Sequence, residues 1–185
     1  MKLHKCTADQ FRAAITDDKA DQFAKTFVAK ANMMKQWENC IGAWDVDELM
    51  GAIIITVSKR APKIANLQLL HTFAKHRRKG VARELCLDGL QRCRIEGQAQ
   101  YLRVSAEPSA VPFYESLGMV MLGKQKSGSK LSMFRIDGSD FRDGLYDVNE
   151  KIIQKAVLRR GKDGRVLKGG CVEIYQEIQQ VSLPE

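Results

Sequence analysis

One segment constrains the fold of this chain more than any other: a strand ends, a basic turn follows, and a helix begins at a glycine. It reads Thr72-Phe73-Ala74-Lys75-His76-Arg77-Arg78-Lys79-Gly80-Val81-Ala82. The first N–H groups of a helix have no partner within the helix, and the helix dipole adds about half a positive charge at the same end. Gly80 and Ala82 have little or no side chain, so a diphosphate can approach the backbone closely. The segment therefore predicts an anion-binding site.

The excess positive charge of the chain is concentrated around the same segment. The 185 residues carry 30 Lys and Arg against 22 Asp and Glu, a net charge of +8. Residues 59–103 alone carry eleven Lys and Arg against three Asp and Glu, which accounts for the whole excess. A positive field this concentrated indicates an anionic partner, which is a phosphorylated cofactor, a nucleic acid or a membrane surface. The alternative is that these residues only keep the surface soluble.

Hydrophobic periodicity predicts a mixed α/β chain. Helical spacing recurs around residues 11–15 and 23–28, with a break at Asp17-Asp18, and again over 80–95 and 108–117. Thr7 and Gln10 have the spacing of a capping box before the first helix. Strands are predicted at 3–6, 40–44, 50–57, 65–73, 101–105, 119–122 and 131–136. The order strand, helix, strand, helix over 65–117 is a βαβα unit, which predicts one parallel pair of strands.

Length and a change of composition near residue 137 predict the domain organisation. A chain of 185 residues corresponds to about one domain. Residues 138–140 read as a linker, and the segment after them is too short to be expected to fold alone. We therefore predict one domain over 1–137 and a C-terminal extension over 138–185 that packs on this domain.

Two motifs together resemble the GCN5-related N-acetyltransferases (GNAT). The coenzyme A loop of that family, R/Q-x-x-G-x-G/A, is matched by Arg77-Arg78-Lys79-Gly80-Val81-Ala82. A second signature, roughly N-x-x-A-x-x-F-Y-x-x-x-G-F, is matched about 30 residues later by 107–119, with Glu107 in place of Asn and Met119 in place of Phe. The resemblance covers 1–137. It implies the GNAT fold: a central mixed, mostly antiparallel sheet splayed at a parallel strand pair and flanked by helices.

The resemblance also implies a reaction and its residues. The reaction is acetyl transfer from acetyl-CoA, the cosubstrate, to an amine-bearing acceptor that attacks the thioester directly, with no metal. A backbone N–H near Thr72 would stabilise the oxyanion. Tyr114 stands at the position of the general acid, where it would donate to the departing thiolate. The residues implied to bind the cosubstrate are Thr72, Arg77, Arg78, Lys79, Gly80, Val81 and Ala82.

The general base is the least defined part of this site. Strand alternation places Asn66 and Gln68 on the same face as Thr72. Some family members have Glu or His at the two amide positions, but an amide cannot accept a proton at neutral pH. We therefore expect Asn66 and Gln68 to face the acceptor substrate. Glu107 is the alternative base, and a water relay is equally compatible with the sequence.

Three other reactive side chains are interpreted as core residues. His71 would point away from the face that carries Asn66 and Gln68, and a satisfied core histidine explains it best. Cys86 and Cys93 are seven residues apart on the core face of the predicted helix over 80–95, so we expect both to pack rather than to carry an acyl group.

Two other classes of function stay open from the sequence alone. One is a nucleic-acid-binding or nucleic-acid-modifying protein that uses the basic stretch 59–103 on phosphates. The other is a non-catalytic acyl-CoA-binding sensor on the same fold. The sequence does not identify the class of acceptor, and it leaves open whether the chain is a monomer or a homodimer.

Cysteine usage and hydropathy predict a cytoplasmic protein. The five cysteines are odd in number and contain no CxxC pair, which fits reduced thiols better than a disulfide framework or a zinc site. No apolar run reaches the roughly 20 residues that a membrane span needs. The first residues also lack the apolar core of a signal peptide. We expect no membrane partner.

Overall fold

The computed structural model describes residues 1–16, 21–58, 64–99, 101–124 and 130–135. The chain divides into two compact units, Met1–Ser58 with Ala65–Gln98 and Lys59–Ile64 with Ala99–Glu185. Each unit is described by itself below. The predicted break at Asp17-Asp18 and the predicted linker and extension over 138–185 lie outside the described residues.

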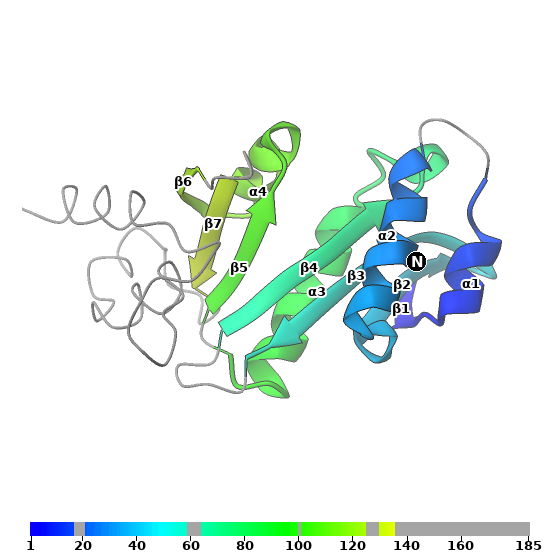
Figure 1. Ribbon diagram of the computed structural model, residues 1–185, viewed down its shortest axis with the longest axis horizontal. Coiled ribbons are helices and arrows are strands. Elements are labelled where there is room, and N and C mark those ends of the chain that lie inside the picture. The colour runs from blue at the N-terminus through cyan, green and yellow to red at the C-terminus, as the bar shows by residue number, and fades with distance from the viewer. Residues whose placement is uncertain (17–20, 59–63, 100, 125–129, 136–185) are drawn as a thin grey trace, which may run out of the picture. The chain divides into compact units, whose positions relative to one another are not determined.

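The first unit is built on antiparallel strands (Figure 1). Strand β1 (Lys2–Lys5) pairs with β2 (Cys40–Asp45), β2 pairs with β3 (Glu48–Val57), and β3 pairs with β4 (Ile64–Thr72). The predicted strands are confirmed to within two residues at each end. Because β3 and β4 are antiparallel, the start of β3 lies beside the end of β4, where the basic turn begins.

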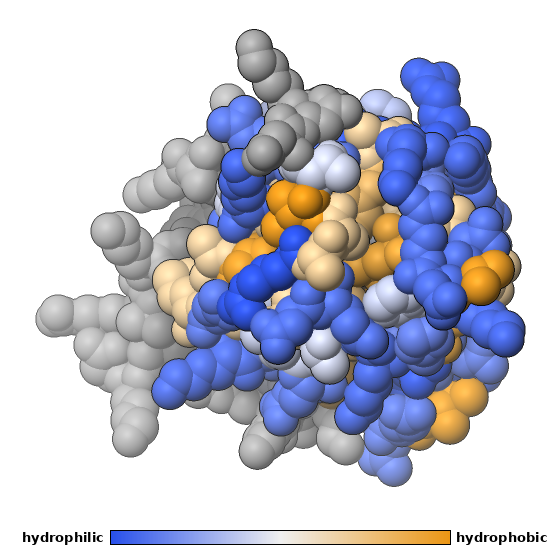
Figure 2. Space-filling view, turned by 90° about the vertical axis from the view of Figure 1, so that its right-hand side faces the viewer, coloured by the Kyte–Doolittle hydropathy of each residue, from blue (hydrophilic) through white to orange (hydrophobic). Residues whose placement is uncertain are grey.

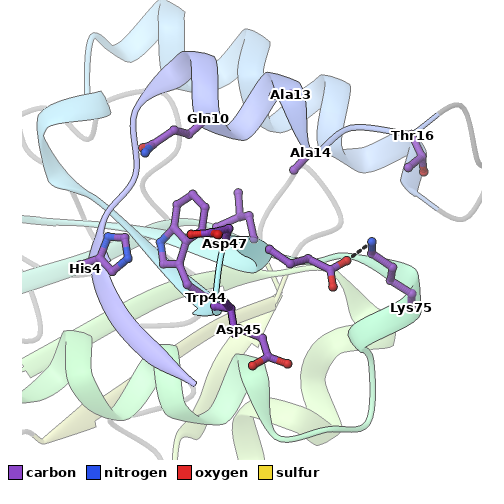
Figure 3. Close-up of a pocket in the computed structure, with 12 residues that line it drawn as sticks. His4, Gln10, Ala13, Ala14, Thr16, Trp44, Asp45, Asp47 and Lys75 are labelled. Carbon is purple, nitrogen blue, oxygen red and sulfur yellow. Dashed lines mark ion pairs between the residues drawn. The ribbon is translucent and has the colours of Figure 1, made fainter.

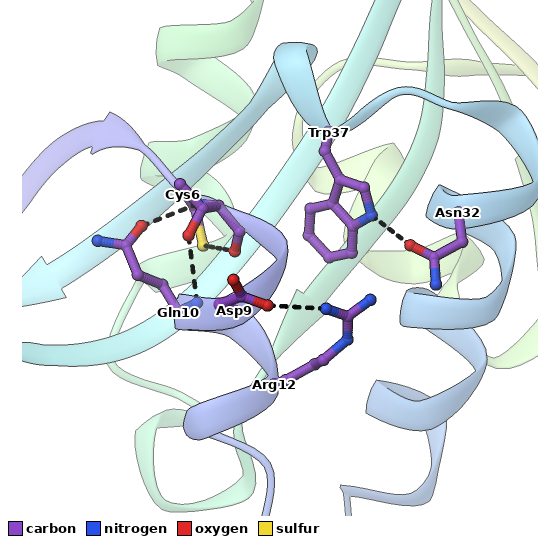
Figure 4. A network of polar contacts seen from close by, with 7 residues as sticks. Cys6, Asp9, Gln10, Arg12, Asn32 and Trp37 are labelled. Carbon is purple, nitrogen blue, oxygen red and sulfur yellow. Dashed lines mark hydrogen bonds and ion pairs between the residues drawn. The ribbon is translucent and has the colours of Figure 1, made fainter.

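Local sequence signals account for the helices of this unit. Helix α1 (Ala8–Ala13) has the predicted capping box, in which Gln10 N–H donates to Thr7 Oγ1 at 3.2 Å and Thr7 N–H donates to Gln10 Oε1 at 2.8 Å (Figure 4). Next come α2 (Gln22–Met34) and the 3₁₀ turn η2 (Trp37–Asn39). The 3₁₀ turn η3 (Ala74–His76) follows β4 and leads to α3 (Val81–Ile95).

Helices cover both faces of the sheet of the first unit, with α2 in front of it and α3 behind it in Figure 1. On the α1 and α2 side, Phe11 stacks on Phe27 with ring centroids 4.5 Å apart and also meets Phe73. On the other side, α3 buries Val81, Leu85, Cys86, Gly89 and Cys93. At Gly89 the helix comes close to β3: a Cβ there would lie 2.5 Å from Ile55 Cδ1, so the end of the Ile55 side chain would have to shift. Both faces of the strands are therefore used in packing.

The second unit contains β5 (Tyr101–Ala106), the 3₁₀ turn η4 (Pro108–Ala110), α4 (Val111–Ser116), β6 (Val120–Lys124) and β7 (Lys130–Arg135). Strand β7 pairs antiparallel with both β5 and β6, and the strands predicted at 119–122 and 131–136 are confirmed to within two residues at each end. The single helix predicted from Pro108 onwards is wrong in its first turn, which is 3₁₀. Pro112 has no N–H to donate to the carbonyl of Pro108, so an α-helical bond cannot form there.

The end of α2 is strained. Lys35 has a left-handed backbone, φ 53° and ψ 44°, in a Schellman motif: Gln36 N–H donates to Ala31 O at 3.2 Å and Lys35 N–H to Asn32 O at 3.1 Å. Glycine adopts this conformation without the steric cost that a Cβ brings.

We expect Lys35→Gly to raise the free energy of unfolding by about 0.5–1 kcal/mol, because the motif keeps its hydrogen bonds and loses the strain. Urea denaturation at an unchanged m-value measures this gain. Lys35→Ala is the matched control, since it removes the same side chain and keeps the Cβ. An equal gain in both variants would contradict this explanation.

Candidate functional site

The segment between β4 and α3 has the backbone of an open anion site. Arg78 and Gly80 both have a left-handed backbone, with φ 60° and φ 79°. Glu84 N–H donates to Gly80 O at 3.0 Å, which is the first hydrogen bond of the helix. The N–H groups of residues 81–83 therefore have no partner within the helix. A Cβ built at Gly80 would meet no atom within 4 Å, so there is room for a ligand against this backbone. Arg78 and Lys79 are exposed at the rim.

Arg77 contacts both the end of β4 and Asp21. Its Nε donates to Thr72 O at 3.2 Å, and its Nη2 lies 3.4 Å from Asp21 Oδ1. The guanidinium thus joins the end of β4 to the residue before α2. Arg77, Arg78 and Lys79 are all exposed, but Arg77 differs from the other two because these contacts hold it against the protein.

A second carboxylate holds the other side of the same turn. Glu48, the first residue of β3, forms an ion pair with Lys75 and lies with Oε1 3.3 Å from His76 Nε2. The hydrogen bond from Lys75 lowers the pKa of Glu48, and His76 acts in the same direction. Because Glu48 begins β3, this pair ties the β2–β3 hairpin to the turn.

His71 is a core residue, as the sequence predicted, but it is not the satisfied histidine expected there, since its buried Nε2 has no hydrogen-bond partner among the described residues. The side chain is 4% exposed, and its ring meets Phe73 edge-on at 4.9 Å and also contacts Phe11 and Phe23. Burial lowers the pKa of His71 to about 4, and the nearby Asp21 only partly opposes this. The ring is therefore neutral at pH 7.

Asn66 and Gln68 lie on β4 at a local irregularity. Ile54 pairs with Leu69 while Ile55 pairs with Leu67, so Gln68 is the extra residue of a β-bulge. Its Nε2 donates to Thr56 Oγ1 at 3.0 Å. The two amide residues and Thr72 are more exposed than Leu67, Leu69 and His71, which agrees with the predicted shared face.

The two predicted catalytic residues belong to the second unit. Glu107 is exposed at the start of η4, and its carbonyl accepts the N–H of Ala110 at 2.9 Å. Tyr114 is buried in α4, with its ring edge-on to Phe113 at 5.1 Å. Its carbonyl closes the helix by accepting from Leu117 and Met119.

Sequence reasoning missed a pocket of about 890 Å³ in the first unit. Figure 3 shows α1 on one side and Trp44 with the β2–β3 hairpin on the other, while the ring of His4 stacks on Trp44 at 5.0 Å. The walls of the pocket come from three separate segments of the chain, so no local sequence motif predicts it. Figure 2 views the side where α1 lies: hydrophilic residues cover most of it, with hydrophobic ones between them. The lining residues are His4, Gln10, Ala13, Ala14, Thr16, Trp44, Asp45, Val46, Asp47, Glu48, Leu49 and Lys75.

The described thiols lie in the core. Among the residues that the structure describes, Cys6, Cys40, Cys86 and Cys93 are buried and free. Burial raises the pKa of Cys86 to about 12 and that of Cys93 to about 11. Neither is a thiolate at neutral pH, which agrees with their interpretation as core residues.

The described ranges contain neither a candidate metal site nor a helix that could span a membrane. No group of three or more His, Cys, Asp or Glu side chains there is arranged to hold a metal ion. None of the helices in this part of the chain combines the length and the apolar character needed to span a membrane.

Comparison with known proteins decides the family. A family described as "Acetyltransferase (GNAT) domain" matches residues 11–136. The chain belongs to this family. No curated protein shows significant sequence similarity to this GNAT chain.

Solved structures share the fold at low sequence identity. Ard1 from Thermoplasma volcanium is 15% identical with a TM-score of 0.56, covering 72% of this chain and 96% of its own. The PaiA N-acetyltransferase from Thermoplasma acidophilum, solved with coenzyme A, is 11% identical with a TM-score of 0.57, covering 72% and 98%. An aminoglycoside 6′-N-acetyltransferase complexed with coenzyme A is 15% identical with a TM-score of 0.57, covering 75% and 99%. The predicted GNAT fold is confirmed.

The buried His71 predicts how stability depends on pH. Its pKa is about 4 in the folded chain against an ordinary 6.5, so between these values the unfolded chain binds a proton that the folded chain does not. The free energy of unfolding should therefore fall by up to about 3 kcal/mol as the pH drops from 6.5 to 4. Urea denaturation across this range measures the loss. His71→Gln should flatten the curve and the exposed His4→Gln should not; equal slopes in all three proteins would refute the assignment.

Proposed function

We propose that the protein is an acetyl-CoA-dependent N-acetyltransferase whose 77–82 loop binds the diphosphate of the cosubstrate. The observation that supports this most directly is the open backbone at Gly80, where a left-handed φ of 79° turns the chain into α3 and leaves space at the helix N-terminus. Helix N–H groups and the helix dipole favour a phosphate at such a position. The fold is shared with acetyltransferases that were solved with coenzyme A.

In this proposal the exposed cations and the start of the helix both contribute to binding of the diphosphate. Arg78 and Lys79 supply charge at the rim, while the N–H groups of Val81 and Ala82 donate hydrogen bonds. The fit is favourable because the loop carries no acidic residue between Thr72 and Ala82. The open space at Gly80 and the N–H groups at the start of α3 support this assignment.

The proposed reaction is direct attack of a neutral amine on the thioester carbonyl. The C–N bond forms, the C–S bond breaks, and the proton lost by the amine goes to a base. The N–H of Phe73 donates to Met50 O at 3.0 Å, so the alternate residue Thr72 turns its N–H away from β3, as an oxyanion donor requires. We assign the general acid to Tyr114 and the base to Glu107.

Proton transfer from a phenol with a pKa near 10 to a thiolate near 8.5 is uphill by about 2 kcal/mol. Tyr114 is therefore expected to act late in C–S cleavage, mainly by hydrogen bonding. Asn66 and Gln68 are proposed to face the acceptor and to hydrogen-bond it. An alkylamine acceptor is protonated at neutral pH, which is why a base such as Glu107 is required.

The acidic hairpin beside the pocket favours an acceptor that carries positive charge. Asp45 and Asp47 line the pocket together with Glu48, whose charge is offset by Lys75. Two carboxylates remain to attract an ammonium group, which is the chemistry of an amine-bearing acceptor. This pocket is the first place to look for acceptor contacts in the first unit.

The alternative use of the basic stretch on nucleic acid receives less support. Lys75, Arg77 and Arg92 each have a carboxylate partner, so their charge is largely compensated within the protein. A non-catalytic acyl-CoA sensor would share the loop and differ only in lacking turnover. Thiol release from acetyl-CoA in the presence of a panel of amines separates an enzyme from a sensor.

We expect Gly80→Asp to weaken coenzyme A binding by about 100-fold, because a carboxylate beside the helix N-terminus repels the diphosphate and competes for its donors. Isothermal titration calorimetry with coenzyme A measures the effect. Gly80→Asn is the matched control: it has the same shape, tolerates a positive φ and carries no charge. Binding by the Asp variant that equals binding by the Asn variant would argue against the loop as the diphosphate site.

We expect Tyr114→Phe to lower turnover by about 100-fold while the affinity for coenzyme A stays within about twofold, because only the proton donor is lost. Thiol release gives the rate and calorimetry gives the affinity. Tyr101→Phe makes the same change in β5 and should leave the rate unaltered. An unchanged rate in Tyr114→Phe would remove Tyr114 from the mechanism.

A further inference from the structure

A buried acidic residue far away in the sequence holds the anion-binding loop. Asp21 lies immediately before α2 and is 4% exposed. A carboxylate this deeply buried is costly unless charged or hydrogen-bonding partners surround it. Its partners lie more than 50 residues further along the chain, in and around η3. The position of Asp21 is therefore coupled directly to the turn that precedes the loop.

A single oxygen of Asp21 gathers the partners. Oδ1 accepts a hydrogen bond from Ala74 N–H at 2.9 Å, lies 3.4 Å from Arg77 Nη2, and lies 3.4 Å from His71 Nε2. The His71 ring is neutral at pH 7, because burial lowers its pKa to about 4. Arg77 is therefore the cation that compensates the charge of Asp21.

These contacts close the turn from both ends. Ala74 begins η3 and Arg77 follows its last residue. Arg77 also donates through Nε to Thr72 O at 3.2 Å, so one guanidinium bridges the last residue of β4 and the Asp21 carboxylate. The backbone is thus held on both sides of η3, immediately before the left-handed residues Arg78 and Gly80.

We propose that Asp21 is a positioning residue that sets the anion-binding loop in its ligand-ready conformation, through Ala74 and Arg77 and without touching the ligand. This inference rests on the proposed function, since the ligand it serves is the diphosphate of coenzyme A. The gain comes from preorganisation: a loop that is already ordered loses less entropy when it binds. Arg77 is consequently a structural cation, and the ligand charge is met by Arg78, Lys79 and the helix.

The test compares three changes by calorimetry with coenzyme A, at a temperature well below the melting point of every variant. Asp21→Ala removes both contacts and should weaken binding about tenfold. Asp21→Asn keeps an oxygen for Ala74 N–H but loses the charge that holds Arg77, so it should weaken binding about threefold. Asp88→Asn is the matched control, because Asp88 forms a comparable pair with Arg92 within α3, at 2.6 Å, and should have no effect.

A double-mutant cycle separates positioning from a general loss of stability. In the Arg77→Gln background, Asp21→Asn should have no further effect on coenzyme A affinity, because the pair acts as a unit. Additive effects would overturn the proposal, as would binding by Asp21→Ala within twofold of the wild type. If Asp21→Ala does not fold, the coenzyme A affinity of Asp21→Asn and the double-mutant cycle test the proposal.

Amide exchange at Ala74, measured by NMR without ligand, tests the contact itself. The Ala74 amide should be protected in the wild type and in Asp21→Asn and should exchange faster in Asp21→Ala; equal exchange in all three would overturn the proposal. If the wild type showed a protected amide but no affinity for coenzyme A, the proposed function would fail while the anchoring contact stood.

Discussion

The packing of α3 against the sheet of the first unit is the interaction on which the rest of the site depends. Its buried side chains and the close approach at Gly89 fix the direction of the helix axis against β3. Since the helix begins directly after the turn that follows β4, its free N–H groups are held at the end of that strand. Because α3 must fill the core beside the sheet, the hydrogen-bond donors at its N-terminus are held in fixed positions. The binding chemistry of the loop thus follows from packing.

The cations around this loop fall into two groups with different physical roles. Lys75 and Arg77 are bound to Glu48 and Asp21, two carboxylates delivered by β3 and by the start of α2. They fix the backbone from both sides, and their charge is compensated. Arg78 and Lys79 are exposed and contribute to the field at the helix N-terminus. Counting basic residues in the sequence therefore overestimates the charge that a ligand meets.

Much of the fold was predictable because it depends on local rules. Thr7 and Gln10 announce a helix start, and the alternation along β4 separates its two faces. The bulge at Gln68 was not predictable, since burial still alternates through it and only the pairing with β3 reveals it. Asp21 and the pocket were missed for a related reason: their partners come from distant segments, and no spacing in the sequence encodes that meeting. The roles of Tyr114 and Glu107 stay predictions, carried by the family motif.

The four buried thiols can report on the opening of the fold, and this use requires no ligand. A protonated thiol inside a packed core does not react with alkylating reagents, whereas the same cysteine in an opened chain does. Cys6 and Cys40 lie in the core shared by β2 and the first two helices, while Cys86 and Cys93 are buried residues of α3. The chain therefore carries natural chemical probes on both faces of one sheet. The order in which they become labelled would report which layer separates first when the domain opens.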